Sequence, residues 1–265
     1  MRASRGGSYV RAMSNISTTT ELPRAASSEA WLRIFARLYD PFCWLGEIAG
    51  MRHRRSALLD GARGRVVEIG AGTGLNIAHY PDEITELVLT EPDASMRRTL
   101  AHRLRRYGRA ARVVDARAER LPLTDASVDT VVSTLVLCTV YDPERTLREI
   151  ARVLRPDGQL LFIEHVRANS RLLAACQDNL LQPWRRFAGG CSCNLPTVEL
   201  IRACGFTVAA TDAVWHGMPP IVRPLMAGRA TPSSRPPLTF PARARSGDET
   251  TTPSVKGAGA PNEMR

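Results

Sequence analysis

Short apolar runs rich in β-branched residues alternate with amphipathic stretches through the middle of the chain. Turn residues bound these runs, which predicts strands at residues 66–69, 86–90, 111–114, 128–133 and 159–163. Between the second and third runs, the stretch 94–107 has helical periodicity, with Met96 and Leu100 on its apolar face. Alternating strands and helices require right-handed crossovers, so the sequence predicts an α/β, Rossmann-like fold: a mostly parallel sheet flanked by helices.

A longer amphipathic region, residues 30–62, precedes the first predicted strand. Asp40-Pro41 interrupts its helical spacing, which predicts two helices that either cover a ligand site or pack on an edge of the sheet. The two ends differ, because residues 1–28 and 231–265 are rich in Ser, Thr, Pro, Arg and Gly and lack periodicity. We therefore expect disordered terminal segments around one domain at residues 29–230.

Composition adds a strong positive charge. Lysine and arginine number 36 against 26 acidic residues, a net charge of +10. Such a charge favours association with nucleic acid, so a protein that binds or modifies RNA is an alternative of another class. Many of the arginines fall in the two ends and on predicted helix surfaces, and we therefore expect no nucleic-acid partner.

The sequence contains no predicted membrane span or export signal. No apolar run reaches the roughly 18–20 residues that a bilayer requires. Arg2, Arg5 and Arg11 stand among small polar residues, without the apolar core of a secretory signal. We expect a cytoplasmic protein, and both peripheral membrane contact and the oligomeric state stay open.

Cysteine spacing predicts no metal site. The six cysteines are Cys43, Cys138, Cys176, Cys191, Cys193 and Cys204. The close pair Cys191-Ser192-Cys193 lacks a second pair and a nearby histidine, so it does not resemble a zinc ribbon. Free thiols in a reducing compartment are the simplest interpretation.

The clearest candidate site is the turn that follows the first strand, Glu68-Ile69-Gly70-Ala71-Gly72-Thr73-Gly74, which leads into a helix predicted at 76–80. Its glycines let a ligand approach the backbone. NAD sites place a pyrophosphate on a G-x-G-x-x-G turn, whereas here the spacing is G-x-G-x-G after an acid. Glu68 would repel a pyrophosphate but could accept hydrogen bonds from the ammonium of an amino-acid ligand. S-adenosylmethionine (SAM) carries such an ammonium beside a cationic sulfonium.

Further acids follow the next strands. Glu91 ends the second strand, where Rossmann-like folds bind ribose hydroxyls, and Asp93 is expected to cap the following helix. Ala118 and Glu119 come just after the third strand, where they could line an adenine ring and accept from its amino group. Parallel strands would bring all of these groups to one edge of the sheet.

In this order, the motifs closely resemble class I SAM-dependent methyltransferases, and Ser127-Val128-Asp129 and Leu154-Arg155-Pro156-Asp157-Gly158 extend the match. Arg117 departs from it, since many relatives carry an acid there. The resemblance implies SAM as the cofactor. The cofactor-binding residues that it implies are Glu68, Gly70, Ala71, Gly72, Gly74, Asn76, Glu91, Pro92, Met96, Ala118, Glu119, Thr134 and Leu135.

A narrower resemblance, to the microsomal alkyl-thiol S-methyltransferases and their bacterial relatives, covers residues 30–230. It is carried by motifs such as Thr134-Leu135-Val136-Leu137-Cys138, Glu164-His165-Val166 and Gly190-Cys191. It implies a small lipophilic acceptor: a thiol, with a quinone, phenol or amine as the alternatives. The acceptor pocket that it implies contains Glu164, Gln177, Trp184, Cys191 and Asn194, although packing alone would also explain Trp184 and Cys191.

This chain departs from that family in two places. Leu195-Pro196 stands where a polar Arg-Asp pair is expected, and residues 1–28 do not resemble the hydrophobic anchor of the vertebrate members.

Methyl transfer from a sulfonium is an in-line displacement that requires neither a metal nor a covalent nucleophile, because the cofactor carries the reactive group. His165, at the end of the fifth strand, is the candidate catalytic residue. It would increase the thiolate fraction of an acceptor as a base, or orient the acceptor, and a structural role is the competing explanation. A SAM-binding protein without turnover is the remaining alternative.

Overall fold

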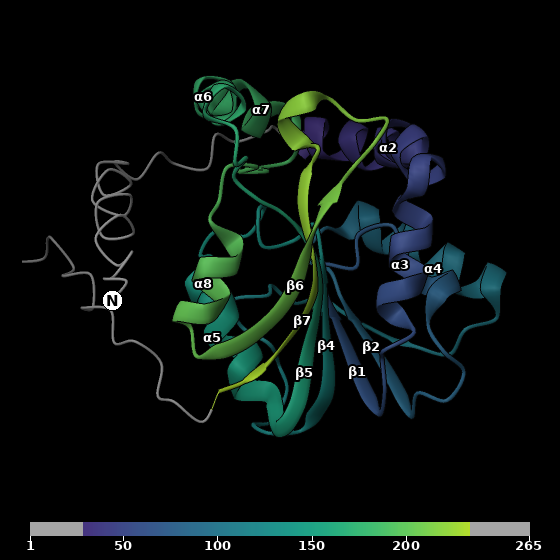
Figure 1. Cartoon of the computed structure of the whole chain (residues 1–265). Helices are drawn as coiled ribbons and strands as arrows, with labels where there is room; N and C mark the ends of the chain where they lie inside the picture. The colour runs from purple at the N-terminus through teal and green to yellow at the C-terminus, as the bar shows by residue number, and fades with distance from the viewer. Residues whose placement is uncertain (1–28, 234–265) are drawn as a thin grey trace, which may run out of the picture.

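Seven strands form one sheet in the part of the chain that the structure describes (Figure 1). This part is residues 29–233 of a computed structural model. The disorder expected for residues 1–28, and for all but the first three residues of 231–265, concerns residues outside it. The strands are β1 (Arg65–Ile69), β2 (Glu86–Thr90), β3 (Arg112–Val114), β4 (Val128–Thr134), β5 (Leu154–His165), β6 (Phe206–Val214) and β7 (Pro224–Pro232). The five predicted strands are all present.

The strand order is β3-β2-β1-β4-β5-β7-β6, and β1 to β5 pair in parallel. Strand β7 runs antiparallel to both β5 and β6. The predicted α/β fold with a mostly parallel sheet is therefore confirmed. Strand β7 continues to Pro232, two residues beyond the expected end of the domain at 230.

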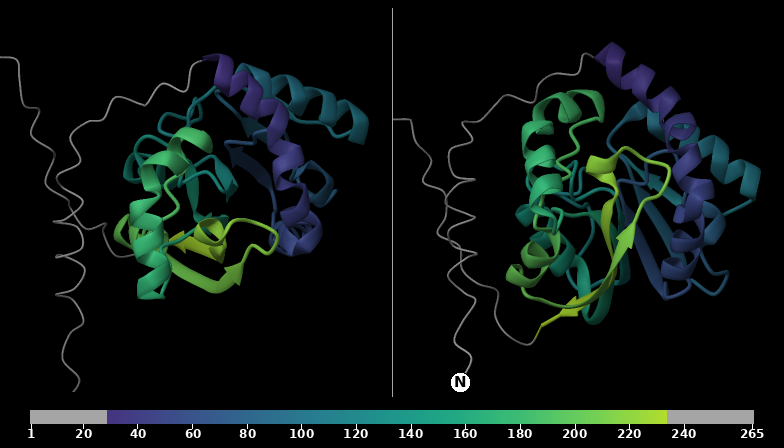
Figure 2. Two further views of the ribbon diagram at one scale, coloured as in Figure 1. Left: turned by 90° about the horizontal axis from the view of Figure 1, so that it is seen from above. Right: turned by 45° about the horizontal axis from the view of Figure 1, so that its top comes forward.

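Helices cover both faces of the sheet and its carboxyl edge. They are α2 (Glu29–Gly46), α3 (Arg52–Leu59), α4 (Ala94–Tyr107), α5 (Pro143–Val153), α6 (Arg171–Asn179), α7 (Leu181–Phe187) and α8 (Thr197–Ala203), with short turns η1 (Glu47–Met51), η2 (Ile77–His79) and η3 (Pro220–Val222). Helices α3 and α4 lie on one face and α5 and α8 on the other, while α2, α6 and α7 gather above the sheet (Figures 1 and 2).

The helix break expected at Asp40-Pro41 is wrong in position. Helix α2 continues through Pro41 to Gly46, and the chain kinks at Gly50, whose φ is 127°. Proline removes one N–H from a helix, but its fixed φ is itself helical, whereas a positive φ is accessible to glycine at little cost. The two expected helices therefore exist, with their boundary about ten residues further along.

The helix expected at 76–80 is only the single 3₁₀ turn η2. Asn76 turns its side chain inward to Glu68 and Thr134, and Pro81 follows directly after Tyr80. A buried side-chain network therefore replaces helical continuation at this point. By contrast, the expected cap of α4 is confirmed, because Asp93 accepts from the N–H groups of Ser95 and Met96, each at 2.8 Å.

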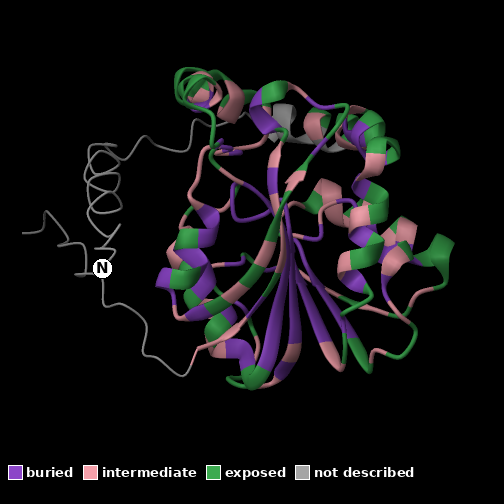
Figure 3. Ribbon diagram, in the orientation of Figure 1, coloured by how far each residue is buried: buried purple, intermediate pink, exposed green. Residues whose placement is uncertain are grey.

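Burial is concentrated in β1, β4 and β5, the centre of the sheet (Figure 3). A second apolar cluster, which we call the upper cluster, covers the carboxyl ends of β4 and β5. Its buried members are Cys43, Met51, Leu135, Cys138, Ile163, Cys191, Cys193, Trp215, Met218, Ile221, Val222 and Leu225. In residues 29–233, we find no helix long and apolar enough to span a membrane.

Candidate active site

The glycine turn after β1 is built around three positive φ angles, 55° at Gly70, 56° at Gly72 and 87° at Gly74. A Cβ on Gly70 would lie 2.9 Å from Val136, and one on Gly74 would lie 2.6 Å from Ile77. The packing of the protein itself therefore requires these two glycines. At Gly72 the nearest atom would be the Met96 sulfur at 3.7 Å, so this backbone faces open space that a ligand can occupy.

Glu68, the acid before the turn, is buried and already hydrogen-bonded. Its Oε1 accepts from Asn76 Nδ2 at 2.8 Å and its Oε2 from the Tyr80 hydroxyl at 2.6 Å. Burial raises the pKa of Glu68 to about 7, and these two hydrogen bonds oppose the rise. A carboxylate can accept about four hydrogen bonds, so capacity for a cationic ligand remains.

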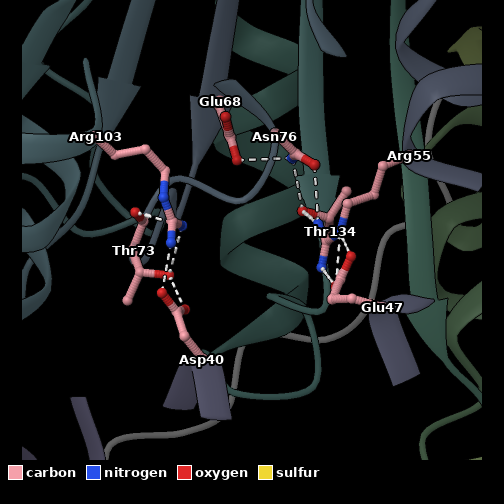
Figure 4. Close-up of polar contacts among 8 residues, drawn as sticks. All are labelled: Asp40, Glu47, Arg55, Glu68, Thr73, Asn76, Arg103 and Thr134. Atoms are coloured by element: carbon pink, nitrogen blue, oxygen red, sulfur yellow. Dashed lines mark hydrogen bonds and ion pairs between the residues drawn. The ribbon is translucent and has the colours of Figure 1, made fainter. Parts of the chain in front are cut away.

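Asn76 connects Glu68 to a buried ion pair from the N-terminal helices (Figure 4). Its Oδ1 accepts from Arg55 Nη1 at 2.9 Å, and its Nδ2 donates to Thr134 Oγ1 at 3.0 Å. Arg55 in turn pairs with Glu47, with 3.0 Å between Nη2 and Oε1. Both charges are buried, so the pair holds Asn76 and Thr134 in fixed positions without leaving a charge uncompensated.

A second polar group attaches α2 to the glycine turn. Asp40 accepts from the Thr73 hydroxyl at 2.6 Å and from Arg103 Nη2 at 2.5 Å, while Arg103 Nη1 donates to the Thr73 carbonyl at 2.9 Å (Figure 4). Residues from α2, the turn and α4 therefore meet at one point. Helix α2 is thereby attached to the turn, which favours the first of the two roles expected for the N-terminal helices, covering a ligand site.

Glu91 reaches across from β2 to the same turn. Its Oε2 accepts from the Gly72 N–H at 2.9 Å and its Oε1 from the Asp93 N–H at 2.8 Å. Burial raises the pKa of Glu91, against these two backbone bonds. Met96 lies beside Gly72, whereas Pro92 is exposed. The glycine turn and the tip of β2 thus form one continuous polar edge.

The two residues expected at the adenine follow β3, the neighbour of β2 in the sheet. Ala118 is buried, and Glu119 Oε1 accepts from the N–H groups of Tyr141 and Asp142 at 2.8 and 3.4 Å. The Glu119 carboxylate thereby joins the loop after β3 to the segment that opens α5.

The segment after β4 contains a strained backbone conformation, which hydrogen bonds to Glu164 hold in place. Leu135 has a φ of 61°, which costs a non-glycine residue about 1–2 kcal/mol. Glu164 Oε1 accepts from the Ser133 hydroxyl and from the N–H groups of Val136 and Leu137 at 2.7, 2.9 and 3.1 Å. Burial raises the pKa of Glu164 to about 7. Glu164 therefore holds the turn on which Leu135 and Cys138 stand.

His165 ends β5 next to the upper cluster. Its ring stacks obliquely on that of Trp215, with 5.8 Å between the ring centroids. Burial lowers the pKa of His165 to about 4, so the ring is neutral at physiological pH. Within residues 29–233, its buried Nδ1 has no hydrogen-bond partner. Cys138 and Cys191 lie beside it, with their sulfur atoms 3.6 Å apart.

The other residues expected in an acceptor pocket do not all converge. Trp184 belongs to the upper cluster and contacts the ring of Phe42. Gln177 is buried, and its amide bonds to backbone groups of Ala168, Cys193 and Ile221, among others.

Asn194 lies apart, where it donates to Asp178 at 2.9 Å. Gln177 and Asn194 therefore position loops, while Cys191 and Trp184 lie in the apolar cluster.

Sequence reasoning missed Asp40, Glu47, Arg55, Arg103 and Cys138. Four of them act through partners that are 8 to 79 positions away, as the Arg55 bonds to Glu47 and Thr134 show. Among these four, a pattern signal existed only for Asp40, whose position before a proline suggested a turn and concealed its role. Cys138 was part of a family motif, but no role was expected for it.

Comparisons with known proteins agree with this geometry. Residues 67–162, from β1 to β5, match a family of methyltransferase domains. A thiol S-methyltransferase of Rattus norvegicus is 33% identical over 146 residues, 54% of this chain and 59% of that protein. A phosphatidylethanolamine N-methyltransferase of Cereibacter sphaeroides is 31% identical over 140 residues, 51% of this chain and 68% of the relative.

Solved structures share the fold. A SAM-dependent methyltransferase of Thermotoga maritima superposes with a TM-score of 0.57 at 23% identity, over 76% of this chain and 98% of that one. The chain spans 59% of the length of the thiol S-methyltransferases from rat and human that it matches. The matched region contains the glycine turn and Glu91.

Proposed function

The chain belongs to the class I SAM-dependent methyltransferases, and from that premise we propose that it transfers the methyl group of SAM to the sulfur of a small lipophilic thiol. The observation that carries this proposal is the upper cluster, which is apolar and rich in cysteine and includes Leu135, the residue directly after Thr134. Such surroundings suit an apolar acceptor and exclude water from the reacting sulfur. The thiol S-methyltransferases among the relatives support the same acceptor class.

The proposed position of the cofactor follows the polar edge. We place the ribose hydroxyls on Glu91 and the backbone of Gly72 beneath the ligand, because this backbone is open. The ammonium of the methionine part would lie near Glu68, whose negative charge it would stabilise. The sulfonium would then face the end of β4 and the upper cluster.

In the reaction, the acceptor sulfur forms a bond to the methyl carbon while the bond from that carbon to the sulfonium breaks. A thiol must also lose its proton, and S-adenosylhomocysteine leaves as the neutral product. The protein contributes mainly by placing the two reactants in line. We assign to His165 the role of promoting ionisation of the acceptor thiol, because its ring is neutral and Nδ1 has no partner in the described part of the chain.

A panel of matched acceptors tests this proposal. Purified protein is incubated with methyl-labelled SAM and butanethiol, butanol, butylamine or a phenol, and products are identified by mass. We expect methyl butyl sulfide, with no comparable transfer to oxygen or nitrogen. Preferential methylation of the amine or the phenol, or SAM binding without transfer to any acceptor, would contradict thiol specificity.

A further inference from the structure

Three buried side chains with metal-binding donor atoms meet in the upper cluster. The sulfur atoms of Cys138 and Cys191 and a ring nitrogen of His165 all lie within 4.8 Å of one another. The positive φ angles of Gly189 and Gly190 turn the chain so that Cys191 points inward, and the Ser192 N–H donates to the Cys138 carbonyl at 2.6 Å. The backbone therefore holds the two thiols together independently of any contact between them.

His165 has the orientation of a histidine prepared to act as a ligand. The backbone carbonyls of Val222 and Pro224 act electrostatically on the ring, and its buried Nδ1 has no hydrogen-bond partner within residues 29–233. A neutral ring that carries its proton on Nε2 keeps a lone pair on this unpartnered Nδ1, where a metal can bind. Metal-bound histidines use their second nitrogen in this way, to donate to a carbonyl or a carboxylate.

The spacing suits a tetrahedral ion. Zinc–sulfur bonds of about 2.3 Å place two thiolates about 3.8 Å apart around zinc, close to the 3.6 Å between Cys138 and Cys191. Even the widest separation in the group, at most 4.8 Å, would need to shorten by only about 1 Å. Three protein ligands leave the fourth position open, as in catalytic rather than structural zinc sites.

The local charges also favour a cation. The Glu164 carboxylate lies next to this group, because it accepts from the backbone N–H groups of Val136 and Leu137, directly before Cys138. Glu164 adds a buried oxygen, Oε2, with no hydrogen-bond partner among the described residues. Two thiolates, one neutral imidazole and one divalent ion sum to zero charge, which an apolar cluster tolerates.

We propose that Cys138, Cys191 and His165 bind a zinc ion whose fourth position takes the sulfur of the acceptor. On zinc binding the two cysteine thiols release two protons, and the incoming acceptor releases one as its sulfur binds the metal. Methylation then removes the charge from that sulfur, and the thioether, a weaker ligand, dissociates. The metal site stands on the geometry above, while the role of the fourth position rests on the proposed function. His165 then promotes ionisation of the acceptor as a ligand of the metal and not as its base.

X-ray absorption at the zinc edge tests the site in the full chain without any substitution. Protein dialysed against a chelator and reloaded with zinc should hold one ion, with two sulfur ligands at about 2.3 Å and one nitrogen at about 2.0–2.1 Å. Addition of butanethiol should raise the sulfur count to three. No retained zinc, or zinc bound only by oxygen and nitrogen, would overturn the proposal.

Substitutions assign the ligands. Cys138→Ser, Cys191→Ser and His165→Asn should each weaken zinc binding more than about 100-fold, since even partners of ligands cost 10–100-fold when lost. Cys204→Ser is the matched control, a buried cysteine in another cluster, and should bind zinc as the original chain does. Equal zinc affinity in all four variants would exclude this ligand set, and circular dichroism identifies any variant that fails to fold.

Activity separates the two proposals. If the zinc site forms with two sulfurs and one nitrogen but no thiol is methylated, the metal site stands and the proposed function fails. If metal-free protein methylates butanethiol as fast as zinc-loaded protein and the thiol adds no sulfur to the zinc, the role of the metal is overturned and the proposed function stands.

Discussion

At the scale of single residues, the three glycines of the turn differ in what they serve. Gly70 and Gly74 are packed against Val136 and Ile77, whereas Gly72 faces open space. The sequence motif alone cannot distinguish these roles, because all three positions are glycines at the same spacing. The distinction depends on which side chains approach from the segment after β4, from η2 and from α4.

Gly72→Ala should therefore impair binding more than folding. Alanine at a φ of 56° costs about 1–2 kcal/mol, while its methyl group would enter the proposed cofactor space and weaken SAM binding at least about tenfold. Gly74→Ala should add a further ~1–3 kcal/mol of overpacking against Ile77 and Leu100. Thermal melts and calorimetric titration with SAM measure both effects, and equal losses of stability in the two variants would contradict the assignment.

Glu68 predicts a pH dependence of cofactor binding. Its pKa of about 7 lies well above the ordinary 4.5, so a large fraction is protonated below pH 7. A cationic ligand favours the ionised form, so binding should release protons and SAM affinity should rise as the pH increases from 5 to 7. The α-amino group of SAM loses its proton above about 7.7–8.0, which ends the rise.

Calorimetry in buffers of different ionisation enthalpy counts the released protons. Arg55 and Glu91 also influence the charge of Glu68. The matched control is Glu68→Gln, because it removes the titrating group and leaves these two neighbours unchanged. This variant should lose most of the dependence between pH 5 and 7. An affinity that falls over this range in the original chain would show that Glu68 does not face the cation.

At the scale of elements, predictions succeeded where local signals agree and failed where distant contacts decide. Asp142 and Pro143 predict the start of α5. Asp142 does cap this helix, because its side chain accepts from the Arg145 N–H at 2.9 Å. Strand β6 gave no comparable signal, because most of its residues are partly or fully exposed. Helix α2 continues through Pro41, and the Asp40 before it contacts Thr73 and Arg103, which are distant in sequence and leave no local pattern.

The attachment of α2 to the turn gives a testable consequence. Asp40→Asn removes the charge that Arg103 binds, and because both side chains are partly exposed the stability loss should be at most about 1 kcal/mol. SAM affinity should fall by about fivefold, or about 1 kcal/mol, because α2 covers the turn less firmly.

Asp125→Asn is the control for this variant. It breaks a salt bridge of similar length, 2.6 Å, between Arg152 and Asp125. If both variants reduce SAM affinity equally, the effect is a general one and not a property of α2.

At the scale of the whole molecule, the order of the motifs predicted the fold and the polar edge, because a glycine turn or an acid follows each of the first three strands. The grouping of Cys138, His165 and Cys191 could not be predicted, since three separate segments bring them together and none has metal-ligand spacing in the sequence. The spacing rule that excluded a metal site applies to ligands close in sequence and does not address this arrangement.

The described domain ends later than composition indicated. The Ser233 N–H donates to the Gly205 carbonyl at 2.8 Å, and Thr231 pairs with Thr207. A chain ended after Ser233 should keep the melting temperature of its described domain, whereas one ended after Ala230 should melt several degrees lower. Both should retain SAM affinity, because these pairs lie at the opposite end of the sheet from the glycine turn. Loss of affinity on ending after Ser233 would show that the tail contributes to the site.

The central claim is that the cofactor binds at the glycine turn and Glu91 and that the acceptor of the methyl group binds at the upper cluster. A crystal structure of the complex with S-adenosylhomocysteine tests this most directly. We predict that the ribose hydroxyls donate to the Glu91 carboxylate, that the ligand passes over Gly72, and that its sulfur faces the side of Cys138 and His165. A nucleoside bound away from Glu91, or a sulfur directed away from the upper cluster, would contradict the account.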